Sequence, residues 1–193
     1  VKVSMVISLP SVCGLFFLAT PILQLIFPRN PEGYDILRYA SLCLPFIILT
    51  QTSTAILQGT GHYLAPIKNL AIGCAGKIIV TLLLVPIQSL NIYGAIIGSI
   101  AAYVITTILN MIALSRRLGV SINFYETTIK PAYAAILMII GVVFIYQYVY
   151  NKTMNNAISC LMSISIGGAA YVAMIVGFGV FNYRYLRSKL YGK

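Results

Sequence analysis

The run LAPIKNLAIGCAGKIIVTLLLV, residues 64–85, determines which class of protein this 193-residue chain belongs to. Its 22 residues include only two charged side chains, Lys68 and Lys77. As an α-helix the run would rise about 33 Å, close to the roughly 30 Å hydrocarbon core of a bilayer. The run also lacks the two-residue alternation that is typical of membrane β-strands. It therefore predicts a transmembrane helix.

Similar apolar runs recur along the whole chain, in which 60% of the residues are hydrophobic and 8% are charged. Because lipid cannot satisfy backbone N–H and C=O groups, spanning segments without strand alternation must be helices. We therefore expect an all-α integral membrane protein with six transmembrane helices. The predicted spans are Ser4–Phe27, Ile36–Leu57, Leu64–Val85, Ile92–Leu114, Pro131–Val149 and Asn156–Phe181.

The basic residues are divided unevenly between the two sides of this topology. One side carries Lys2, Lys68, Arg116, Arg117, Lys130, Arg184, Arg187, Lys189 and Lys193, and the other carries Arg29, Arg38 and Lys152. By the positive-inside rule, this predicts a multi-pass protein of the cytoplasmic membrane with both termini in the cytoplasm. The basic tail, residues 182–193, is then expected to contact anionic lipid headgroups. No basic face on a soluble fold is present, so nucleic acid is not an expected partner.

The chain offers few residues for enzyme chemistry. Its only acids, Glu32, Asp35 and Glu126, fall in predicted loops and cannot cluster around a divalent cation within the membrane. We expect Asp35 to pair with Arg38 at a helix start. The single histidine, His62, is expected to be solvated in a loop, and the four cysteines, which lack CxxC spacing, to be small core residues. The sequence thus predicts no enzyme, no cofactor and no metal.

Lys77 is the main polar feature within the predicted spans. It lies about 20 Å from the cytoplasmic end of its helix and about 14 Å from the outer end. A charge at this depth costs about 3 kcal/mol or more unless it faces the bundle interior or a watery cavity. Two hypotheses stay open. Lys77 marks a ligand or transport pathway, or it bonds backbone carbonyls at kinks set by Pro45 or Pro86.

Several uncharged polar residues also fall within the spans, and Gln51 and Asn69 are the candidates for a substrate pathway among them. The alternative is interhelical hydrogen bonding, worth only about 0.6 kcal/mol for each contact. In the last predicted span, Ala169, Ala173 and Gly177 form a stripe of small residues at four-residue spacing. This stripe predicts close helix packing.

Three segments carry a resemblance to a known family: PILQLIFP (residues 21–28), LRYASLCLPFIILTQTSTAILQGTGHYLAPIKNLAIGCAGKIIVTLLLVP (37–86) and NIYGAIIGSIAAYVITTILN (91–110). In this order and spacing they resemble the carboxyl-terminal half of the polysaccharide transporter and stage V sporulation protein B family. That family belongs to the superfamily of multidrug/oligosaccharidyl-lipid/polysaccharide flippases. The resemblance covers residues 5–115, while the last two spans match only in number and in tail charge.

The resemblance implies a fold of two six-helix lobes that rock around a central cavity, with two extra helices in many members. Residues 1–118 would be the last four helices of the second lobe, and residues 119–193 the two extra helices and the basic tail. The chain would then be a fragment of a longer protein whose amino-terminal lobe is missing. The turn QGTGHYLAP would connect two helices, with its glycines permitting the reversal and Pro66 starting the second helix.

The function implied by the resemblance is translocation of a lipid-linked oligosaccharide or peptidoglycan precursor across the cytoplasmic membrane. Such a function belongs to the synthesis of the cell wall, spore cortex or polysaccharide. Lys77 and Arg38 would attract the anionic headgroup, while the polyprenyl tail stays in lipid. One alternative is a cation-coupled multidrug exporter of the same superfamily, and another is a non-transporting scaffold of a cell-wall synthesis complex.

Overall fold

In the computed structural model, residues 1–29, 32–119 and 125–178 are described. Within these ranges the chain is helical and shows no strand. The elements are α1 (Lys2–Phe17), α2 (Ala19–Ile26), α3 (Tyr34–Ser41), α4 (Leu44–Gly59), α5 (Leu64–Leu84), α6 (Ile92–Leu118), the π-helix η1 (Tyr125–Ile129), α7 (Lys130–Thr153) and α8 (Asn156–Gly177). The predicted all-α fold is confirmed.

Four segments are each long and apolar enough to cross a membrane: α5, α6, residues 127–153 and α8. Two further spans result if α1 with α2, and α3 with α4, each count as one bent span. The described part of the chain therefore contains four to six candidate spans, and six requires both bent pairs. The predicted sixth span, Asn156–Phe181, agrees with α8 as far as Gly177, and its residues 179–181 lie outside the described ranges.

The two predicted spans Ser4–Phe27 and Ile36–Leu57 are each bent in the structure. The first bends by 76° at Leu18 and the second by 42° between α3 and α4. A proline follows each break, Pro21 in α2 and Pro45 in the first turn of α4. A proline has no N–H to donate to the carbonyl four residues earlier, and its ring clashes with that carbonyl. Each of the two spans is therefore interrupted just before its proline.

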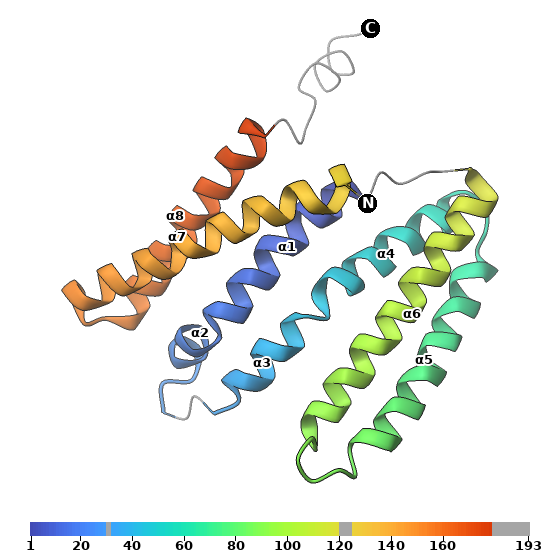
Figure 1. Cartoon of the computed structure of the whole chain (residues 1–193), viewed down its shortest axis with the longest axis horizontal. Helices are drawn as coiled ribbons and strands as arrows, with labels where there is room; N and C mark the ends of the chain where they lie inside the picture. Colours follow the sequence, from blue (N-terminus) through green and yellow to red (C-terminus); the bar gives the residue numbers. More distant parts are fainter. Residues whose placement is uncertain (30–31, 120–124, 179–193) are drawn as a thin grey trace, which may run out of the picture.

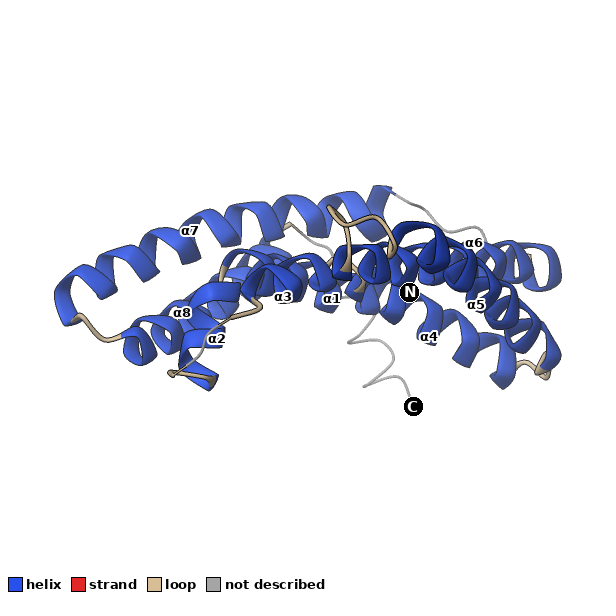
Figure 2. Cartoon of the chain, turned by 90° about the horizontal axis from the view of Figure 1, so that it is seen from below, coloured by secondary structure: helices blue, strands red, loops and turns tan. Residues whose placement is uncertain are grey.

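The long helices alternate in direction (Figure 1). Neighbouring contacts give the order α5, α6, α4, α1, α7, α8 across the molecule. Figure 2 shows that the helices form a broad arch, with α7 and α8 at one end and α5 and α6 at the other. The arch leaves α5 at an edge. Only 6% of the most apolar 18-residue stretch of α5 is buried, against 28–33% of the corresponding stretches in the other three long spans.

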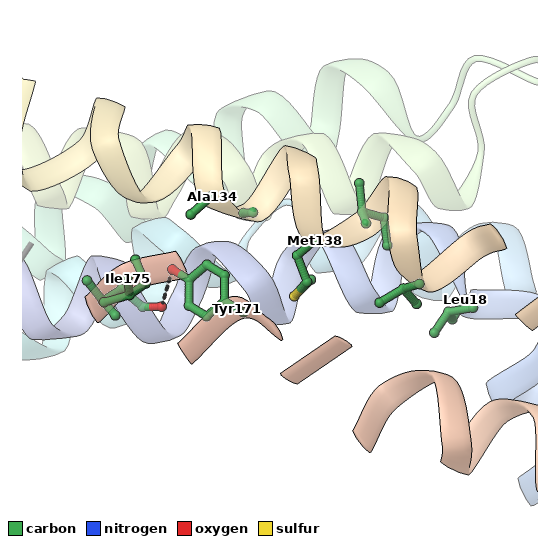
Figure 3. Close-up of a cluster of buried hydrophobic side chains, with 9 residues drawn as sticks. Leu18, Ala134, Met138, Tyr171 and Ile175 are labelled. Carbon is green, nitrogen blue, oxygen red and sulfur yellow. Dashed lines mark hydrogen bonds between the residues drawn. The ribbon is translucent and has the colours of Figure 1, made fainter. Parts of the chain in front are cut away.

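A hydrophobic cluster joins α1, α7 and α8, with Leu18, Met138 and Tyr171 among its buried members (Figure 3). Pro10 lies inside α1 and offers no N–H to the carbonyl of Val6, four residues earlier. The hydroxyl of Tyr171 donates to this carbonyl oxygen at 2.8 Å. A neighbouring helix thus satisfies the backbone acceptor that proline frees, as the hydrocarbon interior requires.

Small residues bring α5 and α6 close together. A Cβ added to Gly94 of α6 would lie 2.8 Å from the carbonyl carbon of Leu84, and one added to Gly73 of α5 would lie 2.7 Å from the carbonyl oxygen of Ala102. Gly98 packs against the side chain of Thr81 in the same way. Close backbone approach at small residues is the usual packing mode of membrane helices.

The stripe predicted for helix packing in α8 is displaced from the one observed. Ala169, Ala173 and Gly177 are all exposed in the described part of the chain. The buried face of α8 instead includes Gly167, where an added Cβ would meet Val142 of α7, and Tyr171. The prediction of close packing by Ala169, Ala173 and Gly177 is therefore wrong within the described residues.

The turn between α4 and α5 follows the predicted geometry. Gly61 adopts a φ of +83°, a left-handed conformation that favours glycine. Pro66 lies in the first turn of α5, where its missing N–H would have no helical partner. His62 lies in this turn, and its Nδ1 is 3.4 Å from the hydroxyl of Thr60.

Candidate functional site

A polar cluster, which we call the asparagine hub, joins α4, α5 and α6. At its centre is Asn110, whose side chain is fully buried in α6. Its Oδ1 accepts a hydrogen bond from Asn69 Nδ2 of α5 at 2.8 Å. Its Nδ2 donates to Ser53 Oγ at 3.2 Å and to Thr54 Oγ1 at 3.1 Å, both on α4. One buried amide therefore holds three helices in register.

A second polar layer lies one turn away, between α4 and α6. The hydroxyls of Thr50 and Thr107 are 2.9 Å apart, and both residues are buried. Thr107 also donates to the carbonyl oxygen of Phe46 at 3.2 Å, and Thr50 donates to that of Tyr103 at 3.4 Å. Together with the asparagine hub, this layer makes α4, α5 and α6 a connected unit within the apolar span.

Lys77 lies on α5, eight residues and therefore about 12 Å along the helix from Asn69. Its side chain is exposed, and α5 is the least covered of the long helices. The proposed hydrogen bonds from Lys77 to kink carbonyls do not occur among the described residues.

The direction of the side chain determines which environment Lys77 can reach. Side chains on a helix lean toward its N-terminus, so Lys77 leans away from Leu84, the nearer end of α5. That nearer end is about 10 Å away and the other end about 20 Å away. Snorkelling to the nearer interface would run against this lean, so we expect the ammonium group to stay at the depth of the hydrocarbon core.

Arg38 makes two polar contacts within the protein. Its Nε donates to the carbonyl oxygen of Phe16 at 3.2 Å, and its Nη1 is 3.5 Å from Asp35 Oδ1. The predicted pairing of Asp35 with Arg38 is confirmed. The guanidinium also lies 5.8 Å from the ring centroid of Phe16 and 6.0 Å from that of Tyr34. Arg38 thus fastens the start of the second bent span to the end of α1.

A cavity of about 480 Å³ opens beside this anchor, between α3 and α6. Asp35, Tyr39 and Leu42 line it from α3, and Tyr93 and Ile97 line it from α6. The rings of Tyr39 and Tyr93 are 5.5 Å apart in an edge-to-face arrangement. Arg38 does not line this cavity, so the structure gives it no direct route to a ligand there.

The four residues predicted for the substrate pathway do not form one cluster. Asn69 belongs to the asparagine hub, and Lys77 lies two turns along the same helix. Gln51 is exposed on α4, about 200° around the helix from Leu49, which faces a cavity on the other side. Arg38 lies at the junction of α1 and α3.

Sequence reasoning grouped Asn110 with the polar residues expected to make interhelical hydrogen bonds, and it proves to be the centre of these contacts. The available signal was an amide in the middle of the apolar 27-residue helix α6. Among the described residues, no group of three or more His, Cys, Asp or Glu side chains could hold a metal ion. Cys43 and Cys160 are buried as predicted, whereas Cys74 on α5 is exposed, so that part of the prediction is wrong.

These apolar helices, joined by buried polar contacts, define a multi-pass α-helical membrane protein. The chain is similar to the uncharacterized membrane protein YabM of Bacillus subtilis (strain 168), with 26% identity over 197 residues. This alignment covers 99% of the chain and 36% of that protein, so the chain spans about a third of the relative's length. No protein-family model and no solved structure matches the chain.

Proposed function

We propose that this chain is part of a membrane transporter that translocates a lipid-linked anionic glycan precursor across the cytoplasmic membrane. The observation that carries the proposal is the position of Lys77, a cation at membrane depth on the largely uncovered helix α5. Facing hydrocarbon, such a charge would cost roughly 3 kcal/mol or more. A passing phosphate or pyrophosphate headgroup would remove that cost while it is bound.

The asparagine hub supports this role because it keeps α5 in place beside α4 and α6. Asn69 ties the first half of α5 to Asn110, and the Lys77 side chain stays exposed on the same helix. In our proposal, an anionic headgroup passes along this exposed side of α5, while the polyprenyl tail stays in lipid. Arg38 is then a positioning residue, because its guanidinium is already held by Phe16 and Asp35.

The uncovered face of α5 is proposed to meet the part of the longer protein that this chain lacks. The chain spans 36% of its Bacillus subtilis relative, which leaves ample length for a second lobe. The described cations at the ends of the helices are also asymmetric, with Lys2, Lys68, Arg116, Arg117 and Lys130 at the end where α1 begins. We propose that this end faces the cytoplasm.

Precursor flipping in vesicles with the full-length protein tests the proposal. Lys77→Met keeps an unbranched side chain but removes the charge, and it should lower the flux about ten-fold or more because charge-assisted bonds are lost. Lys77→Arg should restore most of the flux. Ile78→Met is the matched control, because Ile78 is the next residue and is 59% exposed.

Unchanged flux in Lys77→Met would remove Lys77 from the mechanism. Flux that follows an imposed cation gradient for drug-like substrates, with none for the precursor, would favour the cation-coupled exporter. No flux of either kind, together with co-purification of a cell-wall synthase, would favour the scaffold.

A further inference from the structure

The first bent span is held on both sides of its break by side chains from other helices. The break lies at Leu18, between α1 and α2, where the chain turns by 76°. Before it, the carbonyl oxygen of Phe16 accepts a hydrogen bond from Arg38 Nε at 3.2 Å. After it, the carbonyl oxygen of Pro21 accepts a hydrogen bond from Asn156 Nδ2 at 2.9 Å. We call the break together with these two contacts the Leu18 joint.

Both ends of the Asn156 amide group are engaged. Asn156 is the first residue of α8, and its Oδ1 accepts a hydrogen bond from the hydroxyl of Tyr146 on α7 at 2.8 Å. Because a backbone carbonyl can only accept, the amide nitrogen has to face Pro21 and the amide oxygen then faces Tyr146. Three helices, α2, α7 and α8, thus meet at one half-buried side chain. The proposed transport function makes no use of Asn156.

The direction of α2 depends on its contacts with other helices. Pro21 explains why the first span is interrupted, and Leu18, with φ −98° and ψ 15°, lies outside the α-helical range. With eight residues, α2 is too short to be stable on its own. It packs against α3 and α8, and Figure 2 shows it beside α8. The hydrogen bond from Asn156 is therefore well placed to fix where α2 points.

Arg38 connects the Leu18 joint to the break in the second bent span. Its side chain bonds to Phe16, and its backbone carbonyl oxygen accepts a hydrogen bond from Ser41 Oγ at 2.6 Å. Ser41 is the last residue of α3, just before that second break. A continuous series of contacts therefore runs from α7 and α8 to both bent spans, which is the kind of network that carries coupling between distant elements.

We propose that α7 and α8 act as a brace that sets the direction of α2, with Asn156 as the positioning residue. A shift of this helix pair moves α2 and, through the Leu18 joint and Arg38, the second bent span. Any event that displaces α7 and α8 therefore changes both bent spans together, as in hinge motions about a few residues. This inference holds whether or not the chain takes part in glycan transport.

Electron paramagnetic resonance measures the direction of α2 in the full-length protein. Nitroxide labels are placed at Val3→Cys in α1 and Ile26→Cys in α2, two exposed positions, with the other cysteines replaced by alanine. These positions lie about 22 Å and about 12 Å from Leu18 along their helices. With the 76° bend their Cα atoms are about 28 Å apart, against about 34 Å in a straight span. Asn156→Leu should broaden the distance distribution and move it from about 28 Å toward about 34 Å.

Asn155→Ala is the matched control. Asn155 is the adjacent, exposed residue, and its side chain caps α8 by accepting from the backbone N–H groups of Ala157 and Ile158. Its loss weakens the start of α8 but leaves the bond to α2, so the distance should not change. Tyr146→Phe removes only the bond that orients the Asn156 amide, and it should broaden the distribution by less than Asn156→Leu does.

An unchanged distribution in Asn156→Leu, or an equal change in Asn155→Ala, would overturn the proposal. If Asn156→Leu does not fold, the comparison of Tyr146→Phe with Asn155→Ala decides the question in the same way.

The same labels test the link to Arg38. Arg38→Met should also lengthen the distance, because it releases the other side of the Leu18 joint. If Arg38 and Asn156 hold one joint, the first release already frees α2, so the double variant Arg38→Met/Asn156→Leu should show little further change. Changes that add in full would indicate two independent contacts and contradict the coupling.

Discussion

Replacing Gly94 by alanine should loosen the pair formed by α5 and α6. The new Cβ would lie 2.8 Å from the carbonyl carbon and 2.9 Å from the Cβ of Leu84. Because carbon atoms prefer about 3.5–4.0 Å, the helices must separate by roughly 0.6–1.2 Å. Such overpacking costs about 1–3 kcal/mol, against a gain of up to about 1 kcal/mol in helix propensity. The net effect is a destabilisation of about 1–2 kcal/mol.

Thermal unfolding in detergent, followed by circular dichroism, measures this effect. A loss of about 1–2 kcal/mol should lower the midpoint by roughly 2–8 °C in a chain of this size. The matched control is Gly141→Ala in α7, because a Cβ at Gly141 meets nothing within 4 Å. That variant should gain helix propensity without overpacking, so its midpoint should stay the same or rise.

The test depends on which of the two variants has the higher unfolding midpoint. A midpoint for Gly94→Ala that equals or exceeds that of Gly141→Ala would refute close packing of α5 on α6. It would also undermine the placement of Lys77, which depends on the orientation of α5 against α6.

Three further changes test individual contacts by the same measurement. Asn110→Leu removes three hydrogen bonds and should lower the free energy of unfolding by about 2 kcal/mol, at roughly 0.6 kcal/mol each. Asn69→Leu removes one of these bonds and should lower it by about a third as much. Equal losses of stability would contradict a hub centred on Asn110. Tyr171→Phe leaves the carbonyl of Val6 without its 2.8 Å donor and should cost about 1 kcal/mol, and a neutral result would show that this contact is dispensable. Arg38→Met should destabilise the chain without altering the selectivity of transport, and a change in selectivity would place Arg38 on the substrate pathway.

Much of the fold was predictable because hydrocarbon permits few solutions. The 22-residue run at 64–85 predicted α5 to within one residue, and the start of α6 at Ile92 was predicted correctly. The glycine turn and the pairing of Asp35 with Arg38 were also predictable, since both depend on local chemistry. The hypothesis of interhelical hydrogen bonding is confirmed for Asn69, which bonds to Asn110.

The errors came from features that depend on tertiary context. The bend before Pro21 was not predicted, because an apolar run resembles one span whether it is straight or bent, whereas a kink at Pro45 was part of one hypothesis for Lys77. The stripe in α8 was assigned to the wrong residues because a helix of small and apolar residues has several equally suitable faces, and contact with α7 selects the one with Gly167. Asn110 was missed as a hub because its importance depends on the positions of α4 and α5.

Labelling of α5 with a membrane-impermeant thiol reagent, in the full-length protein with Cys74→Ser, tests the central claim most directly. Lys77→Cys should react, because in our account this position faces a polar pathway within the membrane. Ile78→Cys should not react, because this residue lies about 100° further around the helix, on the apolar face that we propose packs against the part of the protein that this chain lacks. Protection of Lys77→Cys, or equal labelling of both variants, would contradict the account.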